Sequence, residues 1–112
     1  MNKNYTSVEQ SQKLIKLGID KTTSDMHYDK HPLENYYSPI PIIGKYSEIH
    51  DQLPCWSLTA LLNALPAITL DSSDDHHFRI HCMGRYTEWH DNAVDACYEM
   101  IIRLNELKLL QL

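Results

Sequence analysis

A regular alternation of side chains between residues 77 and 82 limits the possible folds of this chain more than any other part of its sequence. Polar and apolar side chains follow one another there in the order His77, Phe78, Arg79, Ile80, His81 and Cys82. A period of two residues is typical of a strand with one buried face. Gly84-Arg85 comes next, and a glycine in first position fits a two-residue type II′ turn. We therefore expect a β-hairpin over residues 77–90.

The length of this turn determines which side chains face each other across the hairpin. A two-residue turn aligns four pairs of residues: Ile80 with Trp89, Cys82 with Thr87, His81 with Glu88, and Arg79 with His90. A three-residue loop would place Trp89 among the histidines on the polar face, because a shift by one residue exchanges the two faces of a strand. Burial of Trp89 therefore favours the two-residue turn.

Capping residues predict two helices near the ends of the chain. Ser7 and Gln10 match a capping box, in which each side chain satisfies a backbone donor of the other residue, so we expect a first helix at 7–17. Asn92 opens a second such pattern, and the apolar residues after it recur at helical spacing. We expect this last helix to cover about 92–109.

Proline alternates with isoleucine in the segment 36–43. Residues two apart point their N–H groups to the same side of a strand, so Pro39 and Pro41 remove two donors from one side. Such a segment is either an edge strand or an extended loop. Residues 20–35, which precede it, are polar and rich in turn-forming residues.

The length of 112 residues favours a single domain over 1–112, with residues 1–6 as a flexible N-terminus. With the middle helix described below, these elements predict an α+β fold. We expect three helices packed against a small, mainly antiparallel sheet that includes the 77–90 hairpin.

The charge of the chain argues against two classes of partner. Its formal net charge is −5, and its lysines and arginines are scattered along the sequence. Proteins that bind nucleic acid or an anionic membrane use a basic face to neutralise phosphate groups. We therefore expect no nucleic-acid partner and no membrane partner.

The cysteines and the start of the chain indicate a cytoplasmic protein. Cys55, Cys82 and Cys97 form an odd set without CxxC spacing, which is typical of free thiols in a reducing compartment. The first seven residues are polar and lack the apolar stretch of a secretory signal.

A metal site is one hypothesis for the hairpin. His81, Glu88 and His90 would come together across it, since opposite and diagonal neighbours lie within roughly 5–8 Å. Two histidines and one carboxylate suit zinc or iron. The alternative is a solvated polar face on which Glu88 pairs with His81 or Arg79.

Sequence motifs give no other reason to propose an enzyme. The chain has no phosphate-binding loop, dinucleotide fingerprint, nucleophile elbow or HExxH motif, and it has only three glycines. We therefore expect no cofactor apart from the zinc or iron alternative, and no catalytic residue.

The middle of the chain resembles a known group of proteins. Ser57 opens an apolar helix that Pro66 ends, and the residues around it read Pro-x-Trp-Ser-Leu-x-x-Leu-Leu. With the hairpin and the closing helix that begins at Asn92, this pattern is similar to small uncharacterised proteins of Bacteroides-type gut bacteria and their phages or mobile elements. The resemblance covers approximately residues 7–20 and 50–110. It implies a compact α+β unit of bacterial or phage origin, and it carries over no activity.

Our leading functional hypothesis is a non-enzymatic accessory or protein-interaction module. Aromatic side chains and strand edges are common in recognition surfaces, so the expected contact residues are Tyr36, Tyr37, Ile40 and Ile42. The same side chains could instead cover the core. Two alternatives remain, a metal-binding or metal-dependent enzyme domain on the hairpin and a structural subunit of a homodimer.

Overall fold

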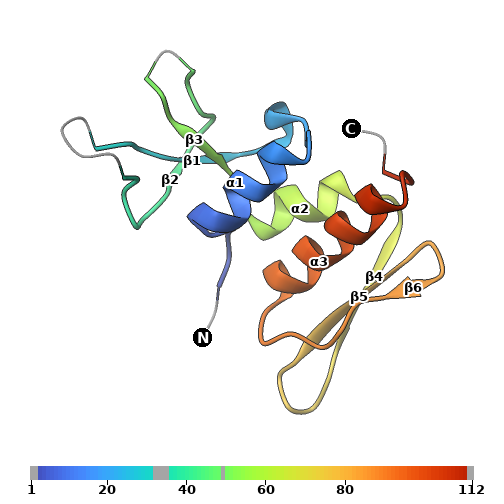
Figure 1. Cartoon of the computed structure of the whole chain (residues 1–112). Helices are drawn as coiled ribbons and strands as arrows, with labels where there is room; N and C mark the ends of the chain where they lie inside the picture. Colours follow the sequence, from blue (N-terminus) through green and yellow to red (C-terminus); the bar gives the residue numbers. More distant parts are fainter. Residues whose placement is uncertain (1–2, 32–35, 49, 111–112) are drawn as a thin grey trace.

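Three α-helices and six β-strands form the described part of the chain, which comprises residues 3–31, 36–48 and 50–110 of this computed structural model (Figure 1). In chain order the elements are α1 (Val8–Lys16), a short 3₁₀ helix (Lys21–Thr23), β1 (Met26–Tyr28), β2 (Ile42–Ile43), β3 (Leu53–Cys55), α2 (Leu58–Ala64), β4 (Ile68–Ser72), β5 (Phe78–Cys82), β6 (Arg85–Tyr86) and α3 (Ala93–Glu106). The predicted α+β class with three helices is confirmed.

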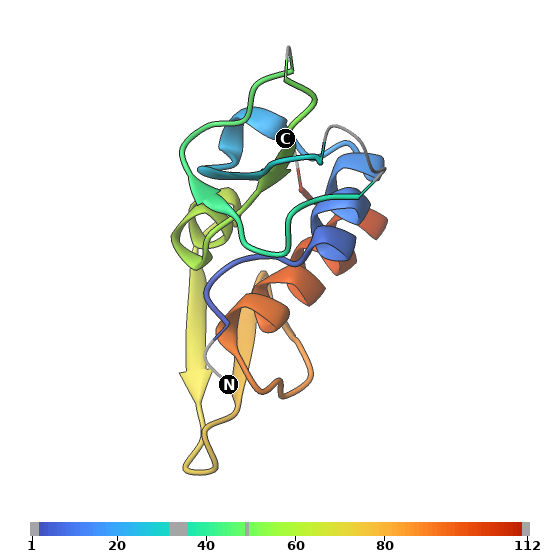
Figure 2. The same cartoon turned by 90° about the vertical axis from the view of Figure 1, so that its left-hand side faces the viewer.

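The strands form two antiparallel sheets of three strands where we expected one. One sheet has the order β2-β1-β3 and the other the order β4-β5-β6. Helix α1 packs against β3 and α3 packs against β5, so the sheets lie at opposite ends of a molecule that measures 45 × 31 × 20 Å (Figures 1 and 2). The first sheet was not predicted because β1 and β3 have only three residues each and β3 contains Pro54. An edge strand such as β3 tolerates proline.

The helices begin where their capping residues predict. The Ser7 hydroxyl accepts a hydrogen bond from the Gln10 N–H at 3.1 Å, and the Gln10 side chain accepts one from the Ser7 N–H at 3.0 Å. The Asn92 side chain caps α3 by accepting a hydrogen bond from the Asp95 N–H at 2.8 Å. Helix α3 ends at Glu106, three residues before the predicted end, because Lys108 adopts a left-handed conformation with φ of 57°.

Two apolar clusters of unequal size hold these elements together. The main core lies between α2, α3 and β5, and its fully buried side chains include Leu61, Ile80, Met100, Ile101 and Leu104. The small core consists of Tyr28, Leu53 and Cys55, which belong to the sheet β2-β1-β3. Trp56 follows Cys55 directly and is itself part of the main core.

The hairpin exists, but its predicted register is wrong. The turn consists of Met83 and Gly84, whose φ angles of 52° and 78° are both positive, as in a type I′ turn. His81 therefore pairs with Tyr86, and Cys82 pairs with Arg85. A glycine fits the second position of a type I′ turn as well as the first position of a type II′ turn, so Gly84 alone does not determine the register.

Threonine takes the buried place that we predicted for Trp89. Thr87 is buried, and its hydroxyl accepts a hydrogen bond from the Ile80 N–H at 2.9 Å. The chain then leaves the regular ladder and pairs again where His90 and Phe78 exchange two backbone hydrogen bonds of 2.7 Å. Trp89 is consequently about half-exposed.

The N-terminal residues contribute to the core. We expected residues 1–6 to be flexible, and residues 1–2 lie outside the described part. Thr6, however, is fully buried, and its N–H donates to the Trp56 carbonyl at 2.9 Å. The Asn4 carbonyl accepts from the Leu58 N–H at 3.0 Å, which attaches this segment to the first turn of α2.

Candidate functional site

Large apolar side chains gather at the surface in residues 36–43, which we call the 36–43 segment. Ile40 and Ile43 are 70% and 86% exposed, and Tyr36 and Ile42 are about half-exposed. Scattered single apolar side chains are normal on a protein surface, whereas a group of neighbours is a feature of interaction sites.

The segment does not present all four predicted contact residues alike. Tyr36, Ile40 and Ile42 lie at the surface. Tyr37 is partly buried and packs against the small core, where its backbone pairs with Lys30. Ile43 was not predicted, although it is the most exposed large apolar side chain in the described residues. No pattern in the sequence around Gly44 indicates that the side chain of Ile43 is exposed.

Strand β2 is an edge strand, and two prolines determine what its free edge offers. The Gly44 N–H donates to the Asp25 carbonyl at 3.0 Å, so even-numbered residues of this strand direct their N–H groups toward β1. Ile43 therefore directs its N–H outward, and Pro39 and Pro41, which precede the strand, have no N–H to donate. Only Ile42–Ile43 are in strand conformation, and residues 38–41 are irregular. The segment therefore presents mainly side chains, and the Ile43 N–H is the outward backbone donor of β2.

A buried histidine holds the end of the segment. The Nδ1 atom of His27 lies 2.9 Å from the Gly44 carbonyl oxygen, at hydrogen-bond distance. Gly44 has φ of +134°, a conformation that L-residues with a side chain rarely adopt. His27 comes from β1, a strand that sequence patterns did not reveal, so this support was not predicted.

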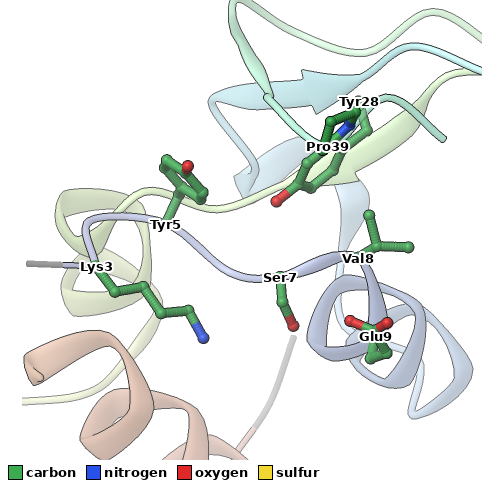
Figure 3. A pocket seen from close by; sticks show the side chains of 7 residues that line it. All are labelled: Lys3, Tyr5, Ser7, Val8, Glu9, Tyr28 and Pro39. Atoms are coloured by element: carbon green, nitrogen blue, oxygen red, sulfur yellow. The ribbon is translucent and has the colours of Figure 1, made fainter. Parts of the chain in front are cut away.

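Two pockets lie on either side of Pro39. The first has a volume of about 390 Å³, and Figure 3 shows the seven side chains that line it: Lys3, Tyr5, Ser7, Val8, Glu9, Tyr28 and Pro39. The second has a volume of about 280 Å³ and is lined by Asp29, Lys30, His31, Tyr36, Ser38 and Pro39. The 36–43 segment thus combines exposed apolar side chains with adjacent hollows.

Two polar side chains at the first pocket already have hydrogen-bond partners. The Tyr28 hydroxyl donates to the Thr6 carbonyl at 2.7 Å, and burial, followed by the proximity of Cys55, raises the pKa of Tyr28 above its ordinary value. The Lys3 ammonium donates to Gln10 at 2.6 Å and to Asp95 at 2.9 Å. Tyr28 is therefore neutral and Lys3 is paired, while the exposed Glu9 also lines the pocket, which combines apolar side chains with one carboxylate at its rim.

The thiols are poor nucleophiles in this structure. Cys55, Cys82 and Cys97 are all free and buried. Burial raises the pKa of the Cys97 thiol to about 12, and it raises the pKa values of the other two as well. Because the thiolate is the reactive form, these residues act as small packed side chains.

The residues of the metal hypothesis do not come together. Tyr86, and not Glu88, pairs with His81 in the observed register. The Glu88 side chain is largely exposed, and the Nε2 atom of His90 lies 2.7 Å from the Glu99 carboxylate on α3. Within the described residues, no group of three histidine, cysteine, aspartate or glutamate side chains is placed to hold a metal ion. The shift of the hairpin register is the physical reason.

No family model, no curated protein and no solved structure matches this chain. None of the helices in the described part has both the length and the apolar character needed to cross a membrane.

Proposed function

We propose that the chain is a non-enzymatic accessory module that binds a protein partner through the 36–43 segment. The observation that carries this proposal is the exposure of Tyr36, Ile40, Ile42 and Ile43 beside two pockets. Ile42 and Ile43 form β2, Tyr36 and Ile40 precede it, and none of the four side chains belongs to either apolar cluster of the described residues.

Binding by side chains is favoured over the addition of a partner strand. A strand added to β2 would meet one outward donor, the Ile43 N–H, because β2 has two residues and Pro39 and Pro41 before it have no N–H to donate. Apolar side chains of the partner would instead cover the isoleucines and enter the pockets beside Pro39. We expect a partner surface with matching apolar groups and little net charge.

The setting we propose is the cytoplasm of a bacterium, with the gene on a phage or mobile element. Three buried free thiols and the absence of CxxC spacing favour a reducing compartment. The bacterial or phage origin rests only on the resemblance of the residues around Trp56, the hairpin and the closing helix.

Site-specific photo-crosslinking tests the proposal. Benzoylphenylalanine replaces Ile43 in one variant and Lys13, an exposed residue of α1, in the control. Both are expressed in the native host, with and without phage induction. A discrete protein crosslinked from position 43 and not from position 13 supports the module. The same proteins crosslinked from both positions would contradict it.

Two further results would locate the contact or identify a different partner. Loss of the crosslink in a Tyr36→Ala background places the contact on the 36–43 segment. A crosslink from position 43 to a second copy of the chain would replace the proposal with a homodimer, and light scattering at two concentrations would then show a dimer. A strict monomer at both concentrations excludes a stable homodimer.

A further inference from the structure

A stack of aromatic and cationic side chains lies on the face of β5 that points away from α3. Arg79 and His81 alternate with the buried residues Ile80 and Cys82, so they occupy the opposite face of the strand. The Arg79 Cζ atom lies 4.2 Å from the ring centroid of Tyr86 and 4.6 Å from that of Trp89. The His81 ring stacks on Tyr86 at 4.4 Å.

The neighbours of Arg79 leave one edge of its guanidinium open. Its Nε atom donates to Asp71 on β4 at 3.1 Å, and its Cζ atom lies over the rings of Tyr86 and Trp89. Among the described residues, neither Nη atom donates a hydrogen bond. The two Nη atoms form the fork that matches the two oxygens of a carboxylate.

We propose that Arg79 is a binding site for a carboxylate, supplied by an aspartate or glutamate side chain of a partner protein. The guanidinium is already fixed by Asp71 and the two rings, so little side-chain entropy remains to be lost when the anion binds. Tyr86 and Trp89 are each about half-exposed and flank the open edge. They would cover apolar side chains next to the acidic residue, a role in which tyrosine and tryptophan are enriched.

Charge favours a carboxylate over a phosphate group. Asp71 already balances the charge of Arg79, and the chain as a whole carries a net charge of −5. A single negative charge is therefore repelled less than the double charge of a phosphate monoester. The site lies on the sheet β4-β5-β6, at the end of the molecule opposite to the 36–43 segment (Figure 2). Its existence is therefore independent of the proposed function.

The two tryptophans make the test selective. Trp89 belongs to the stack, whereas Trp56 is fully buried and its indole N–H donates to Thr23 at 2.9 Å. In ¹H–¹⁵N spectra each gives one indole signal. The probes are the peptides acetyl-Leu-Glu-Leu-amide, acetyl-Leu-Gln-Leu-amide and acetyl-Leu-phosphoSer-Leu-amide, each titrated into the full chain.

The glutamate peptide should shift the indole signal of Trp89 and the Nε–H signal of Arg79, and it should leave Trp56 unchanged. The glutamine peptide has the same shape without the charge, and we expect its dissociation constant to be higher by about tenfold or more. Equal binding of these two peptides, or shifts confined to other residues, would overturn the proposal. Tighter binding of the phosphoserine peptide would replace the carboxylate with a phosphate.

Substitution of the guanidinium provides the second arm. Arg79→Lys keeps the charge and removes the fork, so we expect binding of the glutamate peptide to weaken about tenfold. Arg85→Lys is the matched control, since Arg85 is exposed on the same hairpin and bonds only to the Met83 carbonyl. Unchanged binding in Arg79→Lys would contradict the assignment. The comparison of glutamate and glutamine peptides on the wild-type chain does not depend on how either variant folds.

Discussion

The sheet β4-β5-β6 packs on α3 as part of a main core of fourteen buried residues, whereas the sheet β2-β1-β3 contributes to a small core of three, counted over the described residues. Polar side chains next to the strands of the sheet β2-β1-β3 make further contacts that hold this sheet in place. The Asp25 carboxylate accepts hydrogen bonds from the Ser57 N–H at 2.9 Å and from the Ser57 hydroxyl. The Gln52 side chain donates to Asp29 at 3.0 Å.

This difference separates the residues that stabilise the fold from those that are available for binding. Apolar burial is the main source of folding free energy, and most of it lies between α2, α3 and β5. The isoleucines of the 36–43 segment remain at the surface of the other sheet. The four predictions that follow test this separation, in order of decreasing effect.

A truncation in each core compares the two sheets directly. Leu104 is fully buried in the main core, and Leu104→Ala should lower the free energy of unfolding by about 2–5 kcal/mol. Leu53→Ala in the small core should cost about 2 kcal/mol, at the lower end of the range, because fewer apolar neighbours are lost. Urea denaturation measures both. A larger loss for Leu53→Ala than for Leu104→Ala would break the comparison.

The polar attachment of the small sheet should be weaker but measurable. Asp25→Ala removes the acceptor of both Ser57 hydrogen bonds and should cost about 1–3 kcal/mol. Asp74→Ala is the control, because Asp74 lies exposed in the loop between β4 and β5. Equal stability of the two variants in the same denaturation assay would show that this attachment contributes nothing.

The contact between the N-terminal segment and α3 should depend on pH. Burial alone would raise the pKa of Asp95, but hydrogen bonds from Lys3, Gln10 and Asn92 outweigh it and hold that pKa below its ordinary value. The stabilisation is therefore present above the ordinary pKa of an aspartate and is lost as the pH falls through the lower folded value.

Asp95→Asn measures this stabilisation. Because the Asp95 side chain is about one-third exposed, the substitution should cost only about 1 kcal/mol at neutral pH. The difference from the wild type should be smaller at an acid pH than at neutral pH, because it is lost as the pH falls through the lowered pKa of the folded state and the carboxylate becomes protonated in both states. Denaturation curves at the two pH values provide the test, and an equal cost at both would contradict it.

The hairpin turn should permit a small gain. Met83 has φ of 52°, which is unfavourable for most side chains, and asparagine is the preferred residue in this position of a type I′ turn. Met83→Asn should raise the free energy of unfolding by about 0.5 kcal/mol. Thermal denaturation measures the gain. A loss of stability would contradict the type I′ turn at Met83-Gly84 and favour a turn at Gly84-Arg85.

Local signals predicted much of the fold, and long-range pairing accounts for what they did not predict. The capping side chains of Ser7 and Asn92 act within one helical turn, so α1 and α3 could be predicted from neighbouring residues. Strands β1 and β3 are short and pair across more than twenty residues of chain, with His27 opposite Pro54. Such pairings leave little pattern in a single sequence.

The candidate site was partly predictable for the same reason. The alternation of Pro39 and Pro41 reports on backbone donors, which is a local property, and it correctly excluded a central strand. The exposure of these side chains depends on long-range packing, which the sequence does not reveal. It therefore did not show that Tyr37 is partly buried against the small core and that Ile43 is exposed. The position of Trp89 against Arg79 likewise depends on the hairpin register.

The most direct test of the account measures stability and binding in one variant, Ile40→Ser/Ile42→Ser/Ile43→Ser. If these side chains serve recognition rather than folding, the free energy of unfolding should stay within about 1 kcal/mol of the wild type, as for exposed substitutions. The partner captured by photo-crosslinking, here from position 36, should be lost. A loss of several kcal/mol in stability, or undiminished capture of the partner, would contradict the account.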